Sequence, residues 1–588
     1  MPSSFFIDRD QVVMKLIKYR CKLAEQQAER DQKNEFVSRQ SLHNRVGRIN
    51  DGLYDLFPPR KRWCGIGRER QRLDTLARNE KRLRCTYLKA KRRGCKEEWY
   101  MKLCEKADEI VQRVYRKRQG IAPPKVTVIE KKRQRKNDVD YIVCRPVCSF
   151  PLDLKIIFSL LNKYLTDLFD PYFHDCSYAF RKPSRQNHTL QHLNAVEAIR
   201  EYRIKHSNKK LYVAECDMQK FYDTISHRIV NERFRALLDK AKREKRIGRF
   251  AAAMARKWFF YYVDCFDFIS NVLVHNQKQA DHPFWKNIKN QNGCRCRIEW
   301  VEKALLDRKQ AKKKKHRVGV PQGGALSGLI ANIVMHSVDT KVLESIGEKD
   351  MIYCRFCDDM ILIGEDKNEV VATFESYNSA IAASKLIAHP NQPIVLEHMR
   401  EFWKGKTRGP YKWAQGGSDA YPWITFVGFD INWCGNLRIR KSSFLKQMEK
   451  QTRIANDLLL PYEKGKMPRY CAATILTSLK KRLIAASVGR IELWNYSNNA
   501  NIHSWMSAFS LLDKNPWSEK QMRELDRHRQ KVLARAKKTL SGIHCSNRKK
   551  EVNYRGNNSE QFSFSGCPFS YYGPLIPQLF SLTLFITS

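Results

Sequence analysis

The sequence predicts an α+β fold in which basic helical regions near both ends flank a central region of short paired strands. Near each end, apolar side chains recur at three- and four-residue spacing, which is typical of amphipathic helices. In the centre, short apolar runs end in polar turns, which is the pattern of β-hairpins. With 588 residues, the chain is long enough for several domains.

Charge is the strongest signal in the composition. Lysine and arginine total 109 against 61 aspartates and glutamates, which gives a formal net charge of +48. A surplus this large repels itself unless a polyanion neutralises it, and the usual polyanion is nucleic acid. On charge alone, the alternatives are a merely basic protein or one that lies on an anionic membrane.

Cysteine usage and hydropathy favour the cytoplasm. The 18 cysteines have no regular spacing, which indicates free thiols rather than a disulfide framework. The N-terminus carries acidic residues where a signal peptide would be apolar. Because no apolar run is long enough for a spanning helix, we expect a cytoplasmic protein with no membrane partner.

The first part of the chain is predicted to be helical and then to form a hairpin. Residues 1–124 place strongly basic positions between apolar ones at helical spacing, and the region closes at Pro123-Pro124. Two β-branched runs around a basic turn predict a hairpin at about residues 125–147. Helical sequence with a polar loop follows.

The central part alternates strands, turns and helices. Residues 211–225 begin as a strand and end as a turn, and a basic helical stretch follows to about residue 317. A Gly-rich loop then runs into a helix, in the segment GVPQGGALSGLIANIVMHSVD. Residues 351–365 and 426–440 each predict a hairpin, and helical spacing resumes from Ser442 to about Leu540.

Two carboxylate clusters lie at the predicted strand ends. Asp217 follows an apolar strand, with Asp223 six residues later, and Asp358-Asp359 lies in the turn of an apolar hairpin. Carboxylates crowded between apolar strands repel each other and are tolerated when cations neutralise them. Oxygen ligands in an open site suit Mg²⁺, and two such ions can promote phosphoryl transfer. Taken alone, Asp358-Asp359 is more simply interpreted as a solvent-exposed turn.

The order of these motifs resembles the palm of reverse transcriptases. CDMQKFYD resembles the first palm motif, GVPQGGALSGLIANIVMHSVD the second, YCRFCDDMILIG the third, and FVGFDI the hairpin that holds the primer end. The resemblance covers about residues 125–540. The upstream segment that ends in SYAFRKPSRQNHTL resembles the fingers of the bacterial group II intron lineage, which includes intron-encoded and antiphage defence enzymes.

The resemblance implies a right-hand polymerase fold with fingers, a palm that contains an antiparallel sheet, and a helical thumb. An extra basic helical region precedes them. The implied domains are the N-terminal region 1–124, the fingers 125–210, the palm 211–440 with a basic helical insertion at about 240–317, the thumb 441–544 and a C-terminal tail 545–588.

The resemblance also implies a role for individual residues. Asp217, Asp358 and Asp359 would be the catalytic carboxylates, and two Mg²⁺ ions, with Mn²⁺ as a substitute, would bind them and the backbone carbonyl of Met218. The residues implied to bind the nucleotide are Tyr222 as an aromatic steric gate, Gln322, Gly323, Arg145 and Lys136. Those implied to bind template or primer are Arg181, Phe426, Gly428 and Phe429.

This chain departs from the family pattern in several places. Ser327-Gly328 stands where the family usually has Ser-Pro, and Phe356-Cys357 stands where it commonly has Tyr-Ala. The family often has a lysine after the third motif that could protonate pyrophosphate. His389 or Lys404 is the candidate for that role here.

The implied function is that of an RNA-directed DNA polymerase, which copies a structured non-coding RNA into cDNA from deoxynucleoside triphosphates. Because no integration machinery is visible, the resemblance favours a stand-alone antiphage defence enzyme with a dedicated small RNA. The alternatives are an RNA-dependent RNA polymerase, which Tyr222 argues against, a non-catalytic RNA-binding scaffold, which the intact carboxylates argue against, and a group II intron maturase. The template, the primer and a homo-oligomeric state are left open.

Overall fold

The computed structural model describes residues 7–35, 52–67, 73, 75–116, 121–136, 138–182, 192–276, 283–285, 288, 295–301, 316–392, 405–416, 420–465, 472–488, 505–541 and 569. The chain divides into two compact units. The first comprises Met1–Val12 with Asp108–Val427, and the second comprises Val13–Ala107 with Gly428–Ser588.

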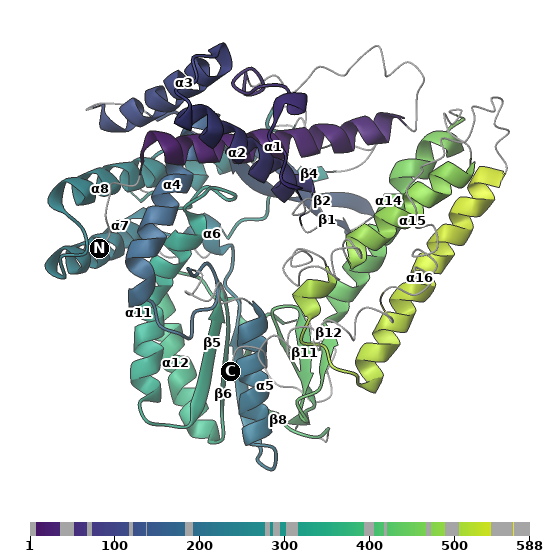
Figure 1. Cartoon of the computed structure of the whole chain (residues 1–588). Coiled ribbons are helices and arrows are strands. Elements are labelled where there is room, and N and C mark those ends of the chain that lie inside the picture. The colour runs from purple at the N-terminus through teal and green to yellow at the C-terminus, as the bar shows by residue number, and fades with distance from the viewer. Residues whose placement is uncertain are drawn as a thin grey trace. The chain divides into compact units, whose positions relative to one another are not determined.

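A six-stranded sheet forms the centre of the first unit (Figure 1). Its strands are β3 (Leu211–Cys216), β5 (Met351–Phe356), β6 (Asp359–Gly364), β7 (Asn391–Gln392), β8 (Thr407–Trp413) and β9 (Ala420–Tyr421). The order is β5-β6-β3-β8-β7, with β9 paired to β8. β3 is antiparallel to both of its neighbours, so its C-terminal end lies beside the start of β6.

Several helices of the first unit pack on this sheet. Helices α11 (Ser327–Ile346) and α12 (Lys367–Ala383) lie beside β5 and β6 in Figure 1, and α5 (His192–Lys205) contacts β5. α11 is apolar on most of its surface, as expected for a helix buried inside a domain. The other helices of this unit are α4 (Leu152–Phe169), η4 (Asp170–Tyr172), α6 (Phe221–Thr224), α7 (His227–Arg243), α8 (Arg249–Asp264), η5 (Ile269–Leu273), α9 (Val274–Asn276) and η6 (Pro283–Trp285).

A second sheet of the first unit contains the hairpin predicted at residues 125–147, which is confirmed. β1 (Lys125–Lys136) and β2 (Val139–Ser149) are antiparallel. Their register shifts at Lys131, since Glu130 pairs with Cys144 while Lys132 pairs with Val143. Lys131 is therefore the extra residue of a β-bulge, a feature that bends a strand and redirects its side chains.

One element corrects the sequence prediction. Residues 295–297 fall within the stretch predicted to be a helical insertion, but they form β4 (Arg295–Arg297), which pairs in parallel with β2. Such a short basic segment has no strand pattern of its own. The open edge of β2 supplies the hydrogen bonds, and the Arg297 guanidinium lies 5.4 Å from the ring centroid of Tyr141 on that strand.

Most of the described residues of the N-terminal region are helical, as the sequence predicts. It contains α1 (Arg9–Glu35), α2 (Thr75–Arg92) and α3 (Glu98–Tyr115), with the short η2 (Arg60–Arg62) between the first two. The Arg20 guanidinium lies 3.7 Å from the ring centroid of Tyr54, so this cation is held against an aromatic face.

The C-terminal region begins with the hairpin predicted at residues 426–440 and continues as helices. β10 (Trp423–Phe426) leads into β11 (Phe429–Asn432) and β12 (Leu437–Ile439), which are antiparallel. Helices α14 (Lys441–Glu463), α15 (Ala472–Ser487) and α16 (Pro516–Ser541) share an apolar cluster, and η10 (Met506–Phe509) precedes the last of them. Apart from Phe569, the predicted tail 545–588 lies outside the described residues. None of the described helices is long and apolar enough to cross a membrane.

Candidate active site

A cavity of about 660 Å³ in the first unit is lined by both the β1–β2 hairpin and the turn after β3. The sheet contributes carboxylates to its lining, and the hairpin and the turn contribute cations. Most of the nucleotide-binding and catalytic residues predicted from the sequence line this cavity, together with several that were not predicted.

Strand pairing brings Asp217 and Asp358 together. Asp217 directly follows β3, Asp358 lies in the β5–β6 turn, and Cys216 pairs with Met360 across β3 and β6. Both aspartates line the cavity. Burial raises the pKa of Asp358, and repulsion from the Asp217 carboxylate raises it further. A cation bound between the two carboxylates would relieve that repulsion.

The β5–β6 turn is tight, and Asp359 lies at its outer edge. Cys357 has a φ of +63°, a left-handed conformation that residues with a side chain rarely adopt. Asp359 pairs with Phe356 across the turn and is exposed. It is not among the residues that line the cavity, so its catalytic role stays a prediction.

A lysine that the sequence did not indicate contacts the first carboxylate. The Lys406 ammonium lies 2.5 Å from Oδ2 of Asp217, and Nε2 of His389 lies 3.8 Å from the same oxygen. Burial lowers the pKa of His389, and the Lys406 charge lowers it further. The sequence pointed to His389 or Lys404 here, and Lys404 lies outside the described residues.

Several cations of the hairpin and of the turn after β3 line the same cavity as the carboxylates. Lys131, at the bulge of β1, lines the cavity with Arg145 of β2 and Lys220 of the turn. Burial lowers the pKa of Lys131, and the charges of Lys220 and Arg145 lower it further. Cations that repel one another in this way form a binding site for a highly charged anion.

Tyr222 lines the cavity and contacts the β5–β6 turn. Its hydroxyl is 3.0 Å from Sγ of Cys357, and its backbone carbonyl accepts a 2.8 Å hydrogen bond from the Val320 amide. The Tyr222 hydroxyl therefore contacts the turn that carries Asp358, and the Tyr222 backbone carbonyl is hydrogen-bonded to the Gly-rich loop.

Gln322 and Gly323 of the Gly-rich loop lie close to the β1–β2 hairpin, and Gln322 also contacts Asp223. The Gln322 side-chain amide donates a hydrogen bond to Asp223, and its carbonyl accepts one of 2.8 Å from the Cys148 amide of β2. Burial raises the pKa of Asp223 to about 7, against the opposing effect of the Gln322 amide. Gly323 has a φ of +82°, and a Cβ atom there would lie 3.2 Å from Cγ1 of Val147, so a larger residue would be strained.

Arg181 is not among the residues that line the cavity, and the backbone of Lys136 lies far along β1 from it. Lys136 ends β1, seven residues along the strand from Ile129, the partner of Arg145, which is roughly 20 Å away at about 3.3 Å per residue. The Arg181 guanidinium is buried, and it binds Asp170 at 2.8 Å and the carbonyls of His174 and Ser177. These contacts hold the segment from Asp170 to Arg181 together.

The predicted primer-holding residues lie around a sharp turn. Phe426 ends β10, and the turn at Val427 and Gly428 has positive φ at both positions, +38° and +97°. Phe426 and Phe429 are buried, and the Phe429 ring lies 5.1 Å from that of Phe509. Any contact with a primer would therefore involve the backbone of this turn rather than the two rings.

Comparison with known proteins agrees with this geometry. Residues 131–392 match the family model described as reverse transcriptase (RNA-dependent DNA polymerase). They contain β2 and the second half of β1, the Asp217 turn, the Gly-rich loop and the Asp358 turn. The chain carries a reverse transcriptase domain. No curated protein sequence matches the chain.

Solved telomerase structures show a partial likeness to the chain. Apo telomerase from Candida tropicalis without its C-terminal domain is 16% identical, with a TM-score of 0.30 over 57% of this chain and 59% of its own. Telomerase from Candida albicans, in complex with a telomeric RNA fragment, is 12% identical, with a TM-score of 0.28 over 73% of this chain and 62% of its own. The chain thus spans about three fifths of the length of these proteins.

The reverse transcriptase domain is that of an RNA-directed DNA polymerase. The α+β right-hand fold expected from the sequence is confirmed, with its antiparallel palm strands β3, β5 and β6 and the helices that pack on them. The boundaries assigned to fingers, palm, insertion and thumb stay predictions.

The residues of the reverse transcriptase domain fit divalent metal ions. Asp217 and Asp358 offer carboxylate oxygens from adjacent strands, and their mutual repulsion raises the pKa of Asp358. An ammonium group already contacts Asp217, which shows that this oxygen attracts a cation. Met218 also lines the cavity, where its backbone is paired with that of Ala388.

Proposed function

We propose that the chain copies an RNA template into DNA at the cavity that holds Asp217 and Asp358. The observation that carries this proposal is the meeting of two sets of charges inside the reverse transcriptase domain. Two carboxylates that flank adjacent strands line one cavity together with Lys131, Arg145 and Lys220. That arrangement suits a nucleoside triphosphate accompanied by divalent cations.

In this proposal, Asp217, Asp358 and the carbonyl of Met218 hold two Mg²⁺ ions, with Mn²⁺ as a substitute and Asp359 beside them. When bound, these ions would activate the primer hydroxyl and stabilise the leaving oxygen. Lys131, Arg145 and Lys220 would bind the triphosphate and orient it. Lys406, whose ammonium lies beside Asp217, would be placed to donate a proton to pyrophosphate as it leaves.

The proposed partners follow from charge and from the type of domain. A net charge of +48 suits a long polyanion, so we propose a structured non-coding RNA as template and cDNA as product. Deoxynucleoside triphosphates would be the substrates. The basic helices of the thumb and of the N-terminal region would contact phosphates, which reads shape and charge more than sequence.

The biological setting is a separate proposal, supported by the likeness of the fingers segment to the bacterial group II intron lineage. We propose a stand-alone cytoplasmic enzyme that acts in antiphage defence with a dedicated small RNA. Sequencing the RNA and DNA that copurify with the protein tests this proposal. One abundant small RNA with matching cDNA is expected, whereas intron RNA or a random sample of cellular RNA would contradict it.

Primer extension tests the activity itself. The purified protein, a primed RNA template and the four deoxynucleotides should give extended DNA in Mg²⁺ and none in EDTA. Titration of the same reaction with Mn²⁺ should restore part of the activity. A protein that binds the primed template but extends no primer with either metal would contradict the proposal.

A further inference from the structure

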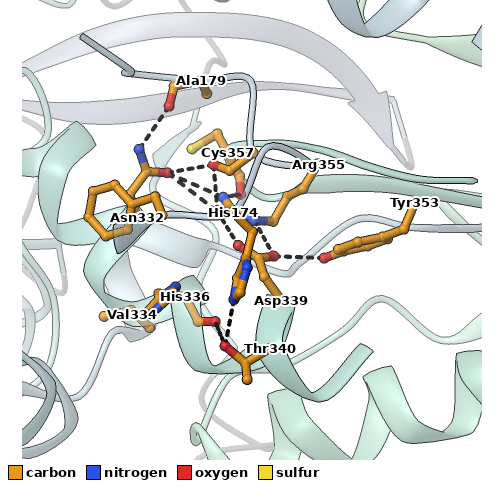
Figure 2. A network of polar contacts seen from close by, with 12 residues as sticks. His174, Ala179, Asn332, Val334, His336, Asp339, Thr340, Tyr353, Arg355 and Cys357 are labelled. Carbon is orange, nitrogen blue, oxygen red and sulfur yellow. Dashed lines mark hydrogen bonds and ion pairs between the residues drawn. The ribbon is translucent and has the colours of Figure 1, made fainter. Parts of the chain in front are cut away.

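A buried ion pair lies directly behind the turn that carries Asp358. Figure 2 shows Arg355 of β5 between Asp339 of α11 and the backbone of Cys357. Arg355 and Asp339 are 0% and 1% exposed. A fully buried charge pair is costly to desolvate and adds little net stability compared with apolar side chains of the same volume. Its presence so near the active site therefore calls for a reason other than stability.

The Arg355 guanidinium has a complete set of acceptors. Nε and Nη2 donate to the two carboxylate oxygens of Asp339, each at 2.7 Å. Nη2 also donates to Oγ of Ser177 at 2.7 Å, and Nη1 donates to the Cys357 carbonyl at 3.0 Å. Oδ1 of Asn332 lies 3.4 Å from Nη1. A planar guanidinium that donates this many hydrogen bonds is held in a single orientation.

Asp339 and Arg355 are each held in place by further hydrogen bonds. Asp339 also accepts a 2.9 Å hydrogen bond from the Tyr353 hydroxyl, which holds the carboxylate in place on α11. The Arg355 backbone amide donates to the Cys176 carbonyl at 2.8 Å, and its own carbonyl accepts from the Tyr178 amide at 2.9 Å. Arg355 is thus fixed by its side chain and by its main chain.

The Cys357 carbonyl is the group whose orientation matters for Asp358. It belongs to the planar peptide group that joins Cys357 to Asp358. The orientation of this carbonyl therefore fixes the direction in which the chain enters Asp358. Cys357 has a φ of +63°, which costs energy and persists only where the surroundings impose it. We propose that Arg355 is a positioning residue, which holds this peptide so that Asp358 faces Asp217 and the two can share metal ions. This inference rests on the proposed polymerase function.

The ion pair supplies a hydrogen bond to the Cys357 carbonyl that an apolar pair could not. Methionine and leucine would fill the volume of Arg355 and Asp339, but neither can donate a hydrogen bond to a carbonyl. Lysine keeps the charge, but a single ammonium cannot match both carboxylate oxygens and reach the Cys357 carbonyl in a fixed plane. Replacement by the apolar pair and replacement of Arg355 by lysine therefore test the orientation of the turn separately from the stability of the fold.

The test compares the wild type with Arg355→Lys and with the double variant Arg355→Met/Asp339→Leu. For each, primer extension gives kcat, the nucleotide KM and the Mg²⁺ concentration at half-maximal rate, and electron paramagnetic resonance gives Mn²⁺ affinity without substrate. We expect the half-saturating Mg²⁺ concentration and the Mn²⁺ dissociation constant to rise by about tenfold or more, as for other residues that orient metal ligands. The nucleotide KM should change little, and the double variant should melt near the wild-type temperature.

The matched control is Tyr202→Phe, which acts at the opposite end of the same hairpin. The Tyr202 hydroxyl donates a 2.7 Å hydrogen bond to the carbonyl of Asp350, the residue directly before β5. This variant should loosen the hairpin without changing metal dependence. A folded double variant or Arg355→Lys with wild-type kcat, Mg²⁺ dependence and Mn²⁺ affinity would overturn the proposal. A wild type that extends no primer would instead refute the polymerase function.

Discussion

The hydroxyl of Tyr222 lies 3.0 Å from the thiol of Cys357, the residue directly before Asp358. The side chain proposed as a steric gate for the sugar is thus attached to the turn that carries Asp358, a carboxylate proposed to be catalytic. Burial is the main reason that the pKa of Tyr222 lies far above its ordinary value, so the hydroxyl stays protonated and can donate to sulfur. Nucleotide selection and catalysis are expected to depend on one another here.

Replacing Tyr222 with valine should weaken selection against ribonucleotides. A ring packed against the sugar leaves no room for a 2′-hydroxyl and offers it no partner, and each effect costs on the order of 1–3 kcal/mol. Discrimination of about a hundredfold should therefore be lost, while deoxynucleotide incorporation declines much less. Primer extension with each nucleotide type measures the ratio. Equal loss of both activities would show that Tyr222 is only a core aromatic, and a wild type that prefers ribonucleotides would favour an RNA polymerase.

The contact between Tyr222 and Cys357 can be tested by a double-mutant cycle. Tyr222→Phe and Cys357→Ala each remove one partner, so each should reduce discrimination by about fivefold, the value of one hydrogen bond of roughly 1 kcal/mol. The double variant should lose no more than either single variant, because the contact can be removed only once. Cys354→Ala, another buried thiol on the same hairpin, is the control and should keep wild-type discrimination. Additive effects would show that the two side chains act independently.

Asp223 should make stability fall with rising pH. Burial raises its pKa from 3.8 to about 7, so the folded chain keeps a proton that the unfolded chain loses. That stabilisation is complete below about pH 4 and is lost as the pH rises to about 7. Relative to Asp223→Asn, the free energy of unfolding of the wild type should fall by on the order of 3–4 kcal/mol over this range. Denaturant melts at several pH values measure the difference. Asp239→Asn, an exposed carboxylate on α7, should show the wild-type profile, and a constant difference for Asp223→Asn would count against the prediction.

The affinity for RNA should depend steeply on salt. A chain with a net charge of +48 that neutralises several phosphates releases the counterions bound to them. We expect the dissociation constant for a structured RNA to rise by about a thousandfold between 50 and 200 mM salt, as is typical for six or more phosphate contacts. Filter binding across a salt series measures the slope. A flat series would show that the surplus charge serves some other purpose.

Local sequence signals predicted the strands and turns around the site. Apolar runs that end at Asp217 and flank Asp358 became β3 and the β5–β6 hairpin, and the Gly-rich loop leads into α11 as expected. These features depend on short-range pattern and turn chemistry. Long-range pairing is less visible in sequence, so neither β4 nor the bulge at Lys131 could be predicted.

Side chains that act across long sequence separations could not be predicted either. Lys406 reaches Asp217 from 189 residues away, and it is one of many lysines in a chain with 109 basic residues. Arg181 occurs in a motif that suggests template contact, yet its acceptors are buried carbonyls and Asp170. The only signal that could have singled out Arg355 is a charged residue inside an otherwise apolar strand, two positions before Cys357.

Substitution of the two cavity carboxylates tests the central claim most directly. Asp217→Asn and Asp358→Asn keep side-chain shape but remove the charges proposed to hold the metal ions. Single-nucleotide incorporation on a primed RNA template should be abolished in both, while RNA affinity remains that of the wild type. The melting temperature in EDTA should stay equal or rise, because the repulsion that raises the pKa of Asp358 is relieved. Incorporation at the wild-type rate by a folded Asp358→Asn protein would contradict the assignment of this cavity as the polymerase site.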